Sequence, residues 1–270
     1  MKRLFLISGF ILSLISVRAD EFPFQSGEEL KFDIHYKYGL VMLKAGTANF
    51  KVVGSNYKNN HAFLSTLDFK TTVFFDKIFK MRDTLSSYAT ENLQPLHHTR
   101  SVNEGNYRFA EEVFFNEFSA KYTEVRIKRE SQQILKFDTI LFTNSFCYDM
   151  LSLISVICSL DYSQMDLSQG KTVSAFIGRD KVAVTVRNEG QSVVEKSETL
   201  KYKTYKIALD FSDSNFNETK SAIEIWISDD KNRVPIKIKA KLRIGAAEVY
   251  LASWKNLKYP LTSEVKIPVK

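Results

Sequence analysis

The sequence predicts a mainly β protein in which a large, antiparallel, curved sheet or barrel-like meander of more than eight strands surrounds one central apolar helix. Most of the chain alternates apolar and polar residues and is rich in β-branched and aromatic side chains. A single stretch, residues 144–162, has a long apolar pattern with helical spacing. Because many antiparallel strands leave exposed edges, curvature or closure of the sheet is the expected solution.

The amino terminus predicts export. Lys2 and Arg3 precede an apolar run at residues 4–17, and Ala19 ends a small-x-small cleavage site, so residues 1–19 are expected to be a signal peptide. Cleavage would leave a soluble chain in the periplasm, with no further stretch long enough to span a membrane. Losing three of 38 basic residues leaves 35 against 31 acidic ones, a net charge of about +4. These charges are scattered, which argues against nucleic acid as a partner.

The first predicted strand, residues 28–37, shows the clearest alternation, with Leu30, Phe32, Ile34 and Tyr36 on one face. Further strands are predicted at residues 45–53, 61–73, 83–90, 94–103, 106–118, 121–129, 133–139, 171–177, 181–188, 192–211, 221–228, 234–243 and 246–256. The stretch from Thr71 to Arg82 fits either a continued strand or a short helical insertion, and the sequence leaves both open.

The predicted helix covers residues 145–161, and Asn144 or Ser145 can cap its start. Apolar side chains occupy most of its circumference, so it is expected to be buried on most sides. Its serine stripe, which includes Ser152 and Ser155, either lets strand backbone approach closely or lines a cavity. The run is too short to cross a bilayer.

The two cysteines, Cys147 and Cys158, lie on this predicted helix. Eleven residues of α-helix separate them by about 16 Å, whereas a disulfide requires Cα atoms within about 7 Å. We therefore expect both thiols to be free and buried.

No Gly-, Pro- or Ser-rich linker divides the chain. Residues 20–270 are therefore expected to form a single β-rich domain. The alternative is two sheet units, at about 20–143 and 163–270, joined by the helix at 145–161.

Two segments resemble a known bacterial family. The first is Gly27-Glu28-Glu29-Leu30-Lys31-Phe32-Asp33-Ile34, followed by Lys44-Ala45-Gly46-Thr47-Ala48, and the second runs from Ile225 to Ile236. An Asp-x-Leu-Ser element, Asp149 to Ser152, lies between them. This order is similar to the exported family catalogued as domain of unknown function 3108. The resemblance implies an envelope-associated, β-rich protein and carries over no catalytic residue.

The residues that could carry chemistry form no catalytic or metal-binding motif. His97 and His98 are adjacent and would point to opposite faces of a strand, so neither a metal site nor a cofactor is expected. No nucleophile elbow or phosphate-binding glycine loop is present, which favours a non-enzymatic protein. A possible polar surface site consists of Trp226, Asp229, Asp230 and Arg233, although such carboxylates are also common in a solvated hairpin turn.

The alternation points many apolar side chains inward. The candidate ligand-binding residues are Phe32, Ile34 and Tyr36 on the first strand and Met150, Leu153, Ile154 and Ile157 on the helix. A sheet of more than eight strands leaves room inside, which predicts a pocket for a lipid-like or other apolar molecule. The alternatives are a structural or assembly factor of the cell envelope with a filled core, whose partner is an envelope component, and a hydrolase without a recognisable motif.

Overall fold

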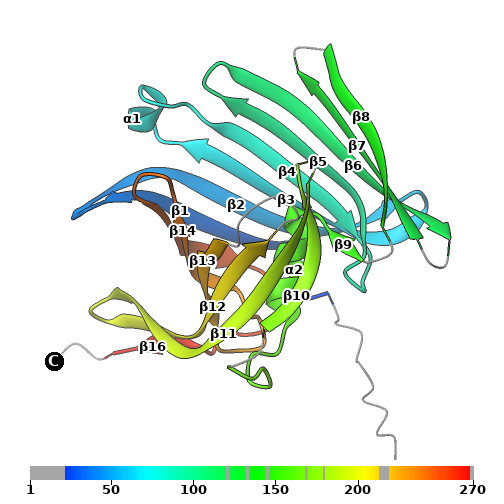
Figure 1. Ribbon diagram of the computed structural model, residues 1–270. Helices are drawn as coiled ribbons and strands as arrows, with labels where there is room; N and C mark the ends of the chain where they lie inside the picture. The colour runs from blue at the N-terminus through cyan, green and yellow to red at the C-terminus, as the bar shows by residue number, and fades with distance from the viewer. Residues whose placement is uncertain are drawn as a thin grey trace, which may run out of the picture.

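The computed structural model describes residues 22–119, 122–131, 134–143, 146–167, 170–178, 180–212 and 219–267. The signal peptide predicted at residues 1–19 and the proposed caps Asn144 and Ser145 lie outside the described residues. Within the described part, every strand belongs to one sheet of 16 strands. The prediction of a mainly β, curved antiparallel fold is confirmed (Figure 1).

The elements follow one another along the chain with two short helices among the strands. They are β1 (Glu28–Tyr38), β2 (Val41–Tyr57), β3 (Asn60–Thr71), α1 (Val73–Asp76), β4 (Arg82–Ala89), β5 (Pro95–Glu104), β6 (Tyr107–Ser119), β7 (Tyr122–Ser131), β8 (Ile134–Thr143), β9 (Cys147–Tyr148), α2 (Met150–Ser159), β10 (Gly170–Ile177), β11 (Asp180–Ser197), β12 (Leu200–Ser212), β13 (Thr219–Ser228), β14 (Pro235–Lys241), β15 (Ala246–Lys255) and β16 (Glu264–Lys266).

The sheet consists of two meanders joined at its middle. The strand order is β8-β7-β6-β5-β4-β3-β2-β1-β15-β14-β13-β12-β11-β10-β9, and β16 pairs with β12. We call β1–β8 the N-terminal wing and β9–β15 the C-terminal wing. The antiparallel pairing of β1 with β15 joins them, with Phe32 opposite Leu251 and Ile34 opposite Val249.

The two ends of the sheet curl toward each other. Val113 and Phe115 of β6 and Val125 and Ile127 of β7 form one buried cluster with Cys147 of β9 and Phe176 of β10. The Lys181 ammonium also donates to the Thr143 hydroxyl over 3.2 Å, which links β11 to β8. Among the described residues, β8 and β9 do not pair, so side chains rather than backbone hydrogen bonds close this barrel-like shape.

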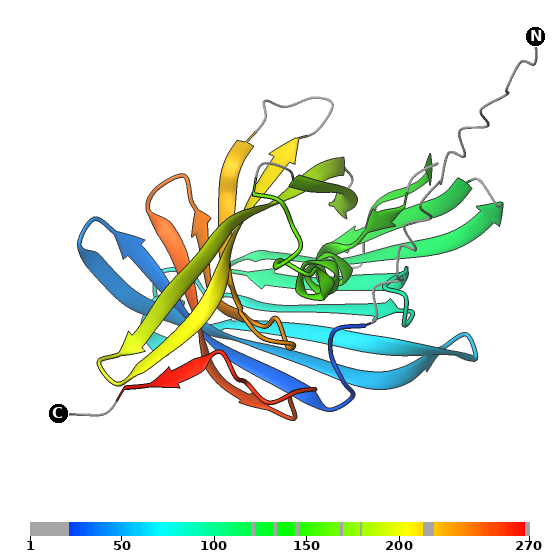
Figure 2. The ribbon, with the colours of Figure 1, turned by 90° about the horizontal axis from the view of Figure 1, so that it is seen from below.

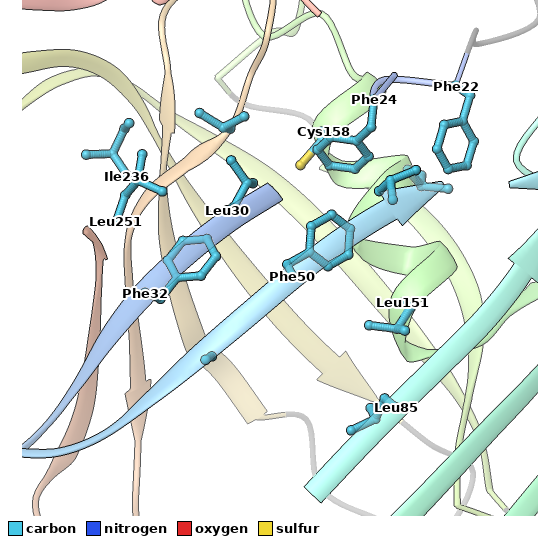
Figure 3. Packing of buried hydrophobic residues seen from close by; sticks show 14 of the residues in the cluster. Phe22, Phe24, Leu30, Phe32, Phe50, Leu85, Leu151, Cys158, Ile236 and Leu251 are labelled. Atoms are coloured by element: carbon cyan, nitrogen blue, oxygen red, sulfur yellow. The ribbon is translucent and has the colours of Figure 1, made fainter. Parts of the chain in front are cut away.

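Helix α2 lies between the two wings, as the view from below shows (Figure 2). Leu151, Val156 and Cys158 belong to the main buried cluster with side chains of β1 and β2, and Figure 3 shows Leu151 and Cys158 in this cluster. Leu153 and Ile157 face a second cluster built by the C-terminal wing. The helix therefore fills the space between the wings with apolar side chains on two sides.

The start of α2 differs from the prediction. The helix begins at Met150 and ends at Ser159, and its N-cap is Asp149, whose carboxylate accepts the backbone N–H groups of Leu151 and Ser152. The Ser152 hydroxyl accepts the Asp149 N–H in return, which completes a capping box. Local side-chain bonds at Asp149 thus set the helix start, and the preceding residues are free to form β9.

Because α2 starts late, Cys147 lies in β9 and only Cys158 lies in the helix, so the predicted helical separation of the two cysteines was wrong. Both cysteines are nevertheless buried, and neither forms a disulfide. Burial raises the pKa of the Cys158 thiol well above its ordinary value, so this thiol remains protonated.

Other segments show an alternative that the structure decides, a predicted strand that is divided, and two short strands that were not predicted. In the stretch from Thr71 to Arg82, β3 ends at Thr71 and α1 follows, which agrees with the helical alternative. The Thr72 hydroxyl accepts the Phe75 N–H and caps this short helix. The strand predicted at residues 192–211 is instead the end of β11, a turn and β12. The strands β9 and β16 have only 2 and 3 residues, too few for alternation to reveal them.

Glu28, at the start of β1, is a carboxyl group inside the core. Its side chain is 2% exposed, and the Gln25 backbone N–H donates to it over 3.2 Å. Burial raises the pKa of Glu28 from 4.5 to about 7, against the opposing effect of the hydrogen bonds from Gln25 and Lys258. The folded protein therefore holds a proton on Glu28 at pH values where the unfolded chain releases it.

We expect the protein to lose stability as the pH rises from about 4.5 to about 7, because the folded state binds more protons than the unfolded state in this window. Glu28→Gln is neutral at every pH and should match the wild type near pH 4. At about pH 8 it should be more stable than the wild type by up to about 3 kcal/mol. Urea unfolding across this range measures the difference, and parallel stability curves for the two proteins would contradict it.

Candidate functional site

The inner face of the sheet carries continuous apolar rows across the strand pairs. Directly opposed residues point to the same face, and one row passes through Ile34, Val249, Ile238, Ile225 and Ile207 of β1, β15, β14, β13 and β12. Ile207 is fully buried, whereas Ile238, Val249 and Ile34 are only half-buried. The aliphatic inner face thus extends beyond the tightly packed core.

A second row changes from apolar to charged residues along the N-terminal wing. It passes through Leu30, Phe50, Leu67 and Leu85 and then continues into Arg100 of β5, Glu111 of β6 and Arg129 of β7. Asp83 and Glu104 occupy the same face, two and four residues from Leu85 and Arg100. We call Asp83, Arg100, Glu104, Glu111 and Arg129 the inner charged cluster.

Glu111 and Arg129 form the buried ion pair of the inner charged cluster. Glu111 is 3% exposed, and the Arg129 Nε–H donates to its carboxylate over 2.8 Å. The Arg129 guanidinium lies 4.4 Å from the centre of the Phe109 ring and 5.1 Å from that of Phe137. A second Arg129 N–H donates to the same Glu111 oxygen. Such stacking and paired donation suit a guanidinium, and they hold this pair in place.

Arg100, unlike Arg129, is not paired with a carboxylate among the described residues. Its guanidinium lies over the Phe109 ring at 5.3 Å and, within the described part of the chain, makes no direct ion pair. Burial raises the pKa of Glu104, and the nearby carboxyl of Asp83 raises it further, while the charge of Arg100 lowers it. Asp83 is buried and accepts the Asn103 backbone N–H over 2.9 Å. The Arg100 donors are therefore available to a hydrogen-bond acceptor on the inner face.

The inner charged cluster was not predicted, although the sequence contains one signal for it. Glu111 falls in phase with Phe109, Val113 and Phe115, so it replaces an apolar residue on the buried face of β6. A charged residue in the apolar phase of a strand requires a partner. That partner, Arg129, lies on the next strand.

The residues predicted to bind an apolar ligand do not gather around one point. Phe32 belongs to the main core cluster, and Ile34, Met150 and Ile154 pack against it. Leu153 and Ile157 belong to the second cluster. Tyr36 lies near the end of β1, where its hydroxyl donates to the Ile244 carbonyl over 3.2 Å. Their role in ligand binding stays a prediction.

The predicted polar surface site forms the turn between β13 and β14. Asp230 accepts hydrogen bonds from the Ser228 hydroxyl and from the backbone N–H groups of Asn232 and Ser263. Arg233 lies 3.6 Å from Asp161 at the end of the α2 segment. Asp229, Asp230 and Arg233 line one open recess of about 240 Å³ together with Tyr162 and Tyr205.

Trp226 does not line this recess. Its ring lies between the ammonium groups of Lys206 and Lys237, at 5.6 and 5.0 Å. The structure thus brings three of the four predicted residues together, and the bonds of Asp230 tie the turn to the carboxy-terminal segment.

A buried group of Ser87, His98 and Asp149 has the composition of a hydrolase triad but not its geometry. The Ser87 hydroxyl donates to the Asp149 carboxylate over 2.7 Å, and the His98 Nδ1 atom lies 3.4 Å from the same group. A nucleophilic serine must instead bond to the histidine that takes its proton. All three side chains are also closed to solvent. This group connects α2 to β4 and β5.

A second recess, of about 270 Å³, lies over strands β4 to β7. Its lining includes Thr84, Ser101, Glu112 and Lys128, which alternate with the inner charged cluster, and also Arg100 and Glu111 of that cluster. Among the described residues, no group of three or more His, Cys, Asp and Glu side chains is placed to hold a metal ion.

Comparison with known proteins gives one family. The sequence profile described as "Protein of unknown function (DUF3108)" matches residues 31–252, which is most of the chain. The chain belongs to the DUF3108 family. Its Asp149–Ser152 element, one part of the resemblance noted in the sequence, is the capping box of α2. No curated protein matches the chain.

The fold of this DUF3108 protein also occurs in a solved structure. A crystal structure described as a beta-barrel-like protein of domain of unknown function DUF1849, from Brucella abortus, is similar with a TM-score of 0.58 and 11% identity. The similarity covers 86% of this chain and 98% of that chain. At this identity the comparison shows the barrel-like fold alone.

Proposed function

We propose that this DUF3108 protein is an exported, non-enzymatic binding protein that holds an amphiphilic molecule on the inner face of its curved sheet. The observation that carries the proposal is that the inner face holds both chemistries: one row keeps half-buried aliphatic side chains on β1, β15 and β14, and the other row ends in the inner charged cluster on β5 to β7. The apolar part of the ligand would lie along the row that contains Ile34, Val249 and Ile238. A head group that accepts hydrogen bonds would face Arg100.

Electrostatics supports this arrangement. Arg129 neutralises Glu111, and Arg100, which makes no direct ion pair among the described residues, supplies a second positive charge in the cluster. Arg100 provides five N–H donors in a fixed plane.

Proposed export to the periplasm is supported by the basic and apolar amino-terminal segment, and cell fractionation tests it.

Binding of a fluorescent fatty acid tests the function, together with extraction of amphiphiles from protein purified out of its own host. We expect saturable probe binding that extracted material displaces. Arg100→Met should weaken the affinity by about tenfold to a hundredfold, because a hydrogen bond to a charged group contributes about 1.5–3 kcal/mol. Arg126→Gln is the matched control, since Arg126 pairs with Asp138 on an exposed surface.

The second candidate function is a structural or assembly factor of the cell envelope. The observation that favours it is the close packing of α2, where Leu151, Val156 and Ile157 are at most 3% exposed. A protein that carries no extractable amphiphile and does not bind the probe would exclude the binding function and leave this one.

A further inference from the structure

Large apolar side chains are exposed at the tips of two hairpins and around α1. They are Tyr38, Leu40, Val41, Met42 and Leu43 on the β1–β2 hairpin, Leu242 and Ile244 on the β14–β15 hairpin, and Val73, Phe74, Ile78 and Phe79 on and after α1. We call these residues the apolar tip surface. Leu40 and Val73 are 104% and 80% exposed, so they contribute nothing to the core.

The three parts of the apolar tip surface are neighbours. Lys37 of β1 pairs with Ala246 of β15, and the Tyr36 hydroxyl donates to the Ile244 carbonyl. The Thr72 N–H, at the start of α1, donates to the Ala45 carbonyl of β2 over 2.9 Å. Figure 1 shows α1 and both hairpin tips along one side of the molecule, and Figure 2 shows the two hairpin tips side by side from below.

Basic residues accompany these apolar side chains. Lys77, Lys80, Lys241 and Arg243 are exposed in the same segments. The acidic residue among them is Asp76, which Arg82 neutralises at 2.7 Å. Within the part of the chain that the structure describes, none of the four basic side chains forms a salt bridge. The surface therefore combines exposed apolar area with uncompensated positive charge.

Both properties match the surface of a membrane that contains anionic lipids. Apolar side chains on protruding tips can enter the interface between head groups and acyl chains, while lysine and arginine contact the anionic head groups. Neither helix in the described residues has the length and apolar character needed to span a bilayer. We propose that the apolar tip surface docks this protein peripherally onto a membrane containing anionic lipids. This inference does not depend on a ligand at the inner face.

The insertion step can be measured with a single dye. Cys147 and Cys158 are 5% and 1% exposed, so a thiol introduced at the surface reacts selectively. An environment-sensitive fluorophore on Leu40→Cys should shift its emission to shorter wavelength with vesicles of phosphatidylcholine and phosphatidylglycerol. Vesicles of phosphatidylcholine alone should give a smaller shift. Val193→Cys, on β11 and 56% exposed, is the matched control and should show no shift.

The electrostatic contribution to membrane binding is tested with two double variants that change the net charge by the same amount. In vesicle flotation, Lys77→Glu/Lys80→Glu should bind anionic vesicles about tenfold or more weakly, and added salt should weaken the wild type as well. The control Lys255→Glu/Lys266→Glu changes the net charge equally at the other end of β15 and on β16, and it should bind like the wild type.

Three results would overturn the proposal. The first is absence of binding to anionic vesicles, and the second is binding that is equal for both lipid compositions and both double variants. The third is a protein that does not bind vesicles but forms a concentration-dependent dimer in sedimentation velocity, and this dimer is abolished by Leu40→Ser. That result would assign the apolar tip surface to contacts between two copies of the chain.

Discussion

Replacing Asp149 by alanine is expected to lower the free energy of unfolding by about 3 kcal/mol. The carboxylate is 1% exposed and accepts four hydrogen bonds, from the backbone of Leu151 and Ser152 and from the hydroxyls of Ser87 and Ser152. Loss of an N-cap costs about 1 kcal/mol, and each buried donor left without a partner costs about 1–3 kcal/mol. Because the bonds share one carboxylate, these effects are not independent and the sum is smaller than the list suggests.

Asp149→Asn is the matched control for this prediction. Asparagine is also a favourable N-cap, and its carbonyl oxygen can keep the bonds from the helix backbone. It should therefore recover more than half of the stability that alanine loses in urea unfolding experiments. Equal losses for the two variants would show that the capping box does not determine the stability of α2.

A second large effect is expected from Leu151→Asp, which should lower stability by about 4 kcal/mol or prevent folding. Leu151 has no exposed surface and lies in the main core cluster. An aspartate there must stay unpaired among apolar side chains or take up a proton, and either outcome is costly.

Ile154→Asp is the informative comparison for Leu151→Asp, because it introduces the same group one helical turn away. Ile154 is only half-buried, so the new carboxylate can reach solvent and the loss should be smaller. Thermal unfolding and circular dichroism of both variants measure the difference. If Ile154→Asp is as destabilising as Leu151→Asp, the inner face is closed over the helix at that position.

The alternation of apolar and polar residues predicted the strands because one face of each strand is buried and the other faces solvent. β1 was predicted within one residue, as Leu30, Phe32 and Ile34 alternate with polar residues. The helix start was wrong because the apolar run beginning at Phe146 looks continuous, while Asp149 ends the extended segment by hydrogen-bonding to its own backbone. The spacing of Asp149 and Ser152, three residues apart, was the signal in the sequence for a capping box at this helix start.

The inner charged cluster could be predicted only in part. The phase of Glu111 on β6 can be read from neighbouring phenylalanines, but its partner depends on the pairing of β6 with β7. Similarly, the exposed residues of the apolar tip surface look like ordinary strand residues in the sequence. Their exposure follows from how far each hairpin extends beyond the core, which only the register of the pairs reveals.

The pairing of β1 with β15 also constrains when the chain can fold. Asn256 donates to the Gly27 carbonyl although 229 residues separate them, so the middle of the sheet forms between opposite ends of the chain. Contacts of such large sequence separation slow folding. A chain emerging from a ribosome leaves one edge of β1 unpaired until β15 has been synthesised. The two wings can therefore join only after almost the whole chain is available, although each wing is a meander of neighbouring strands.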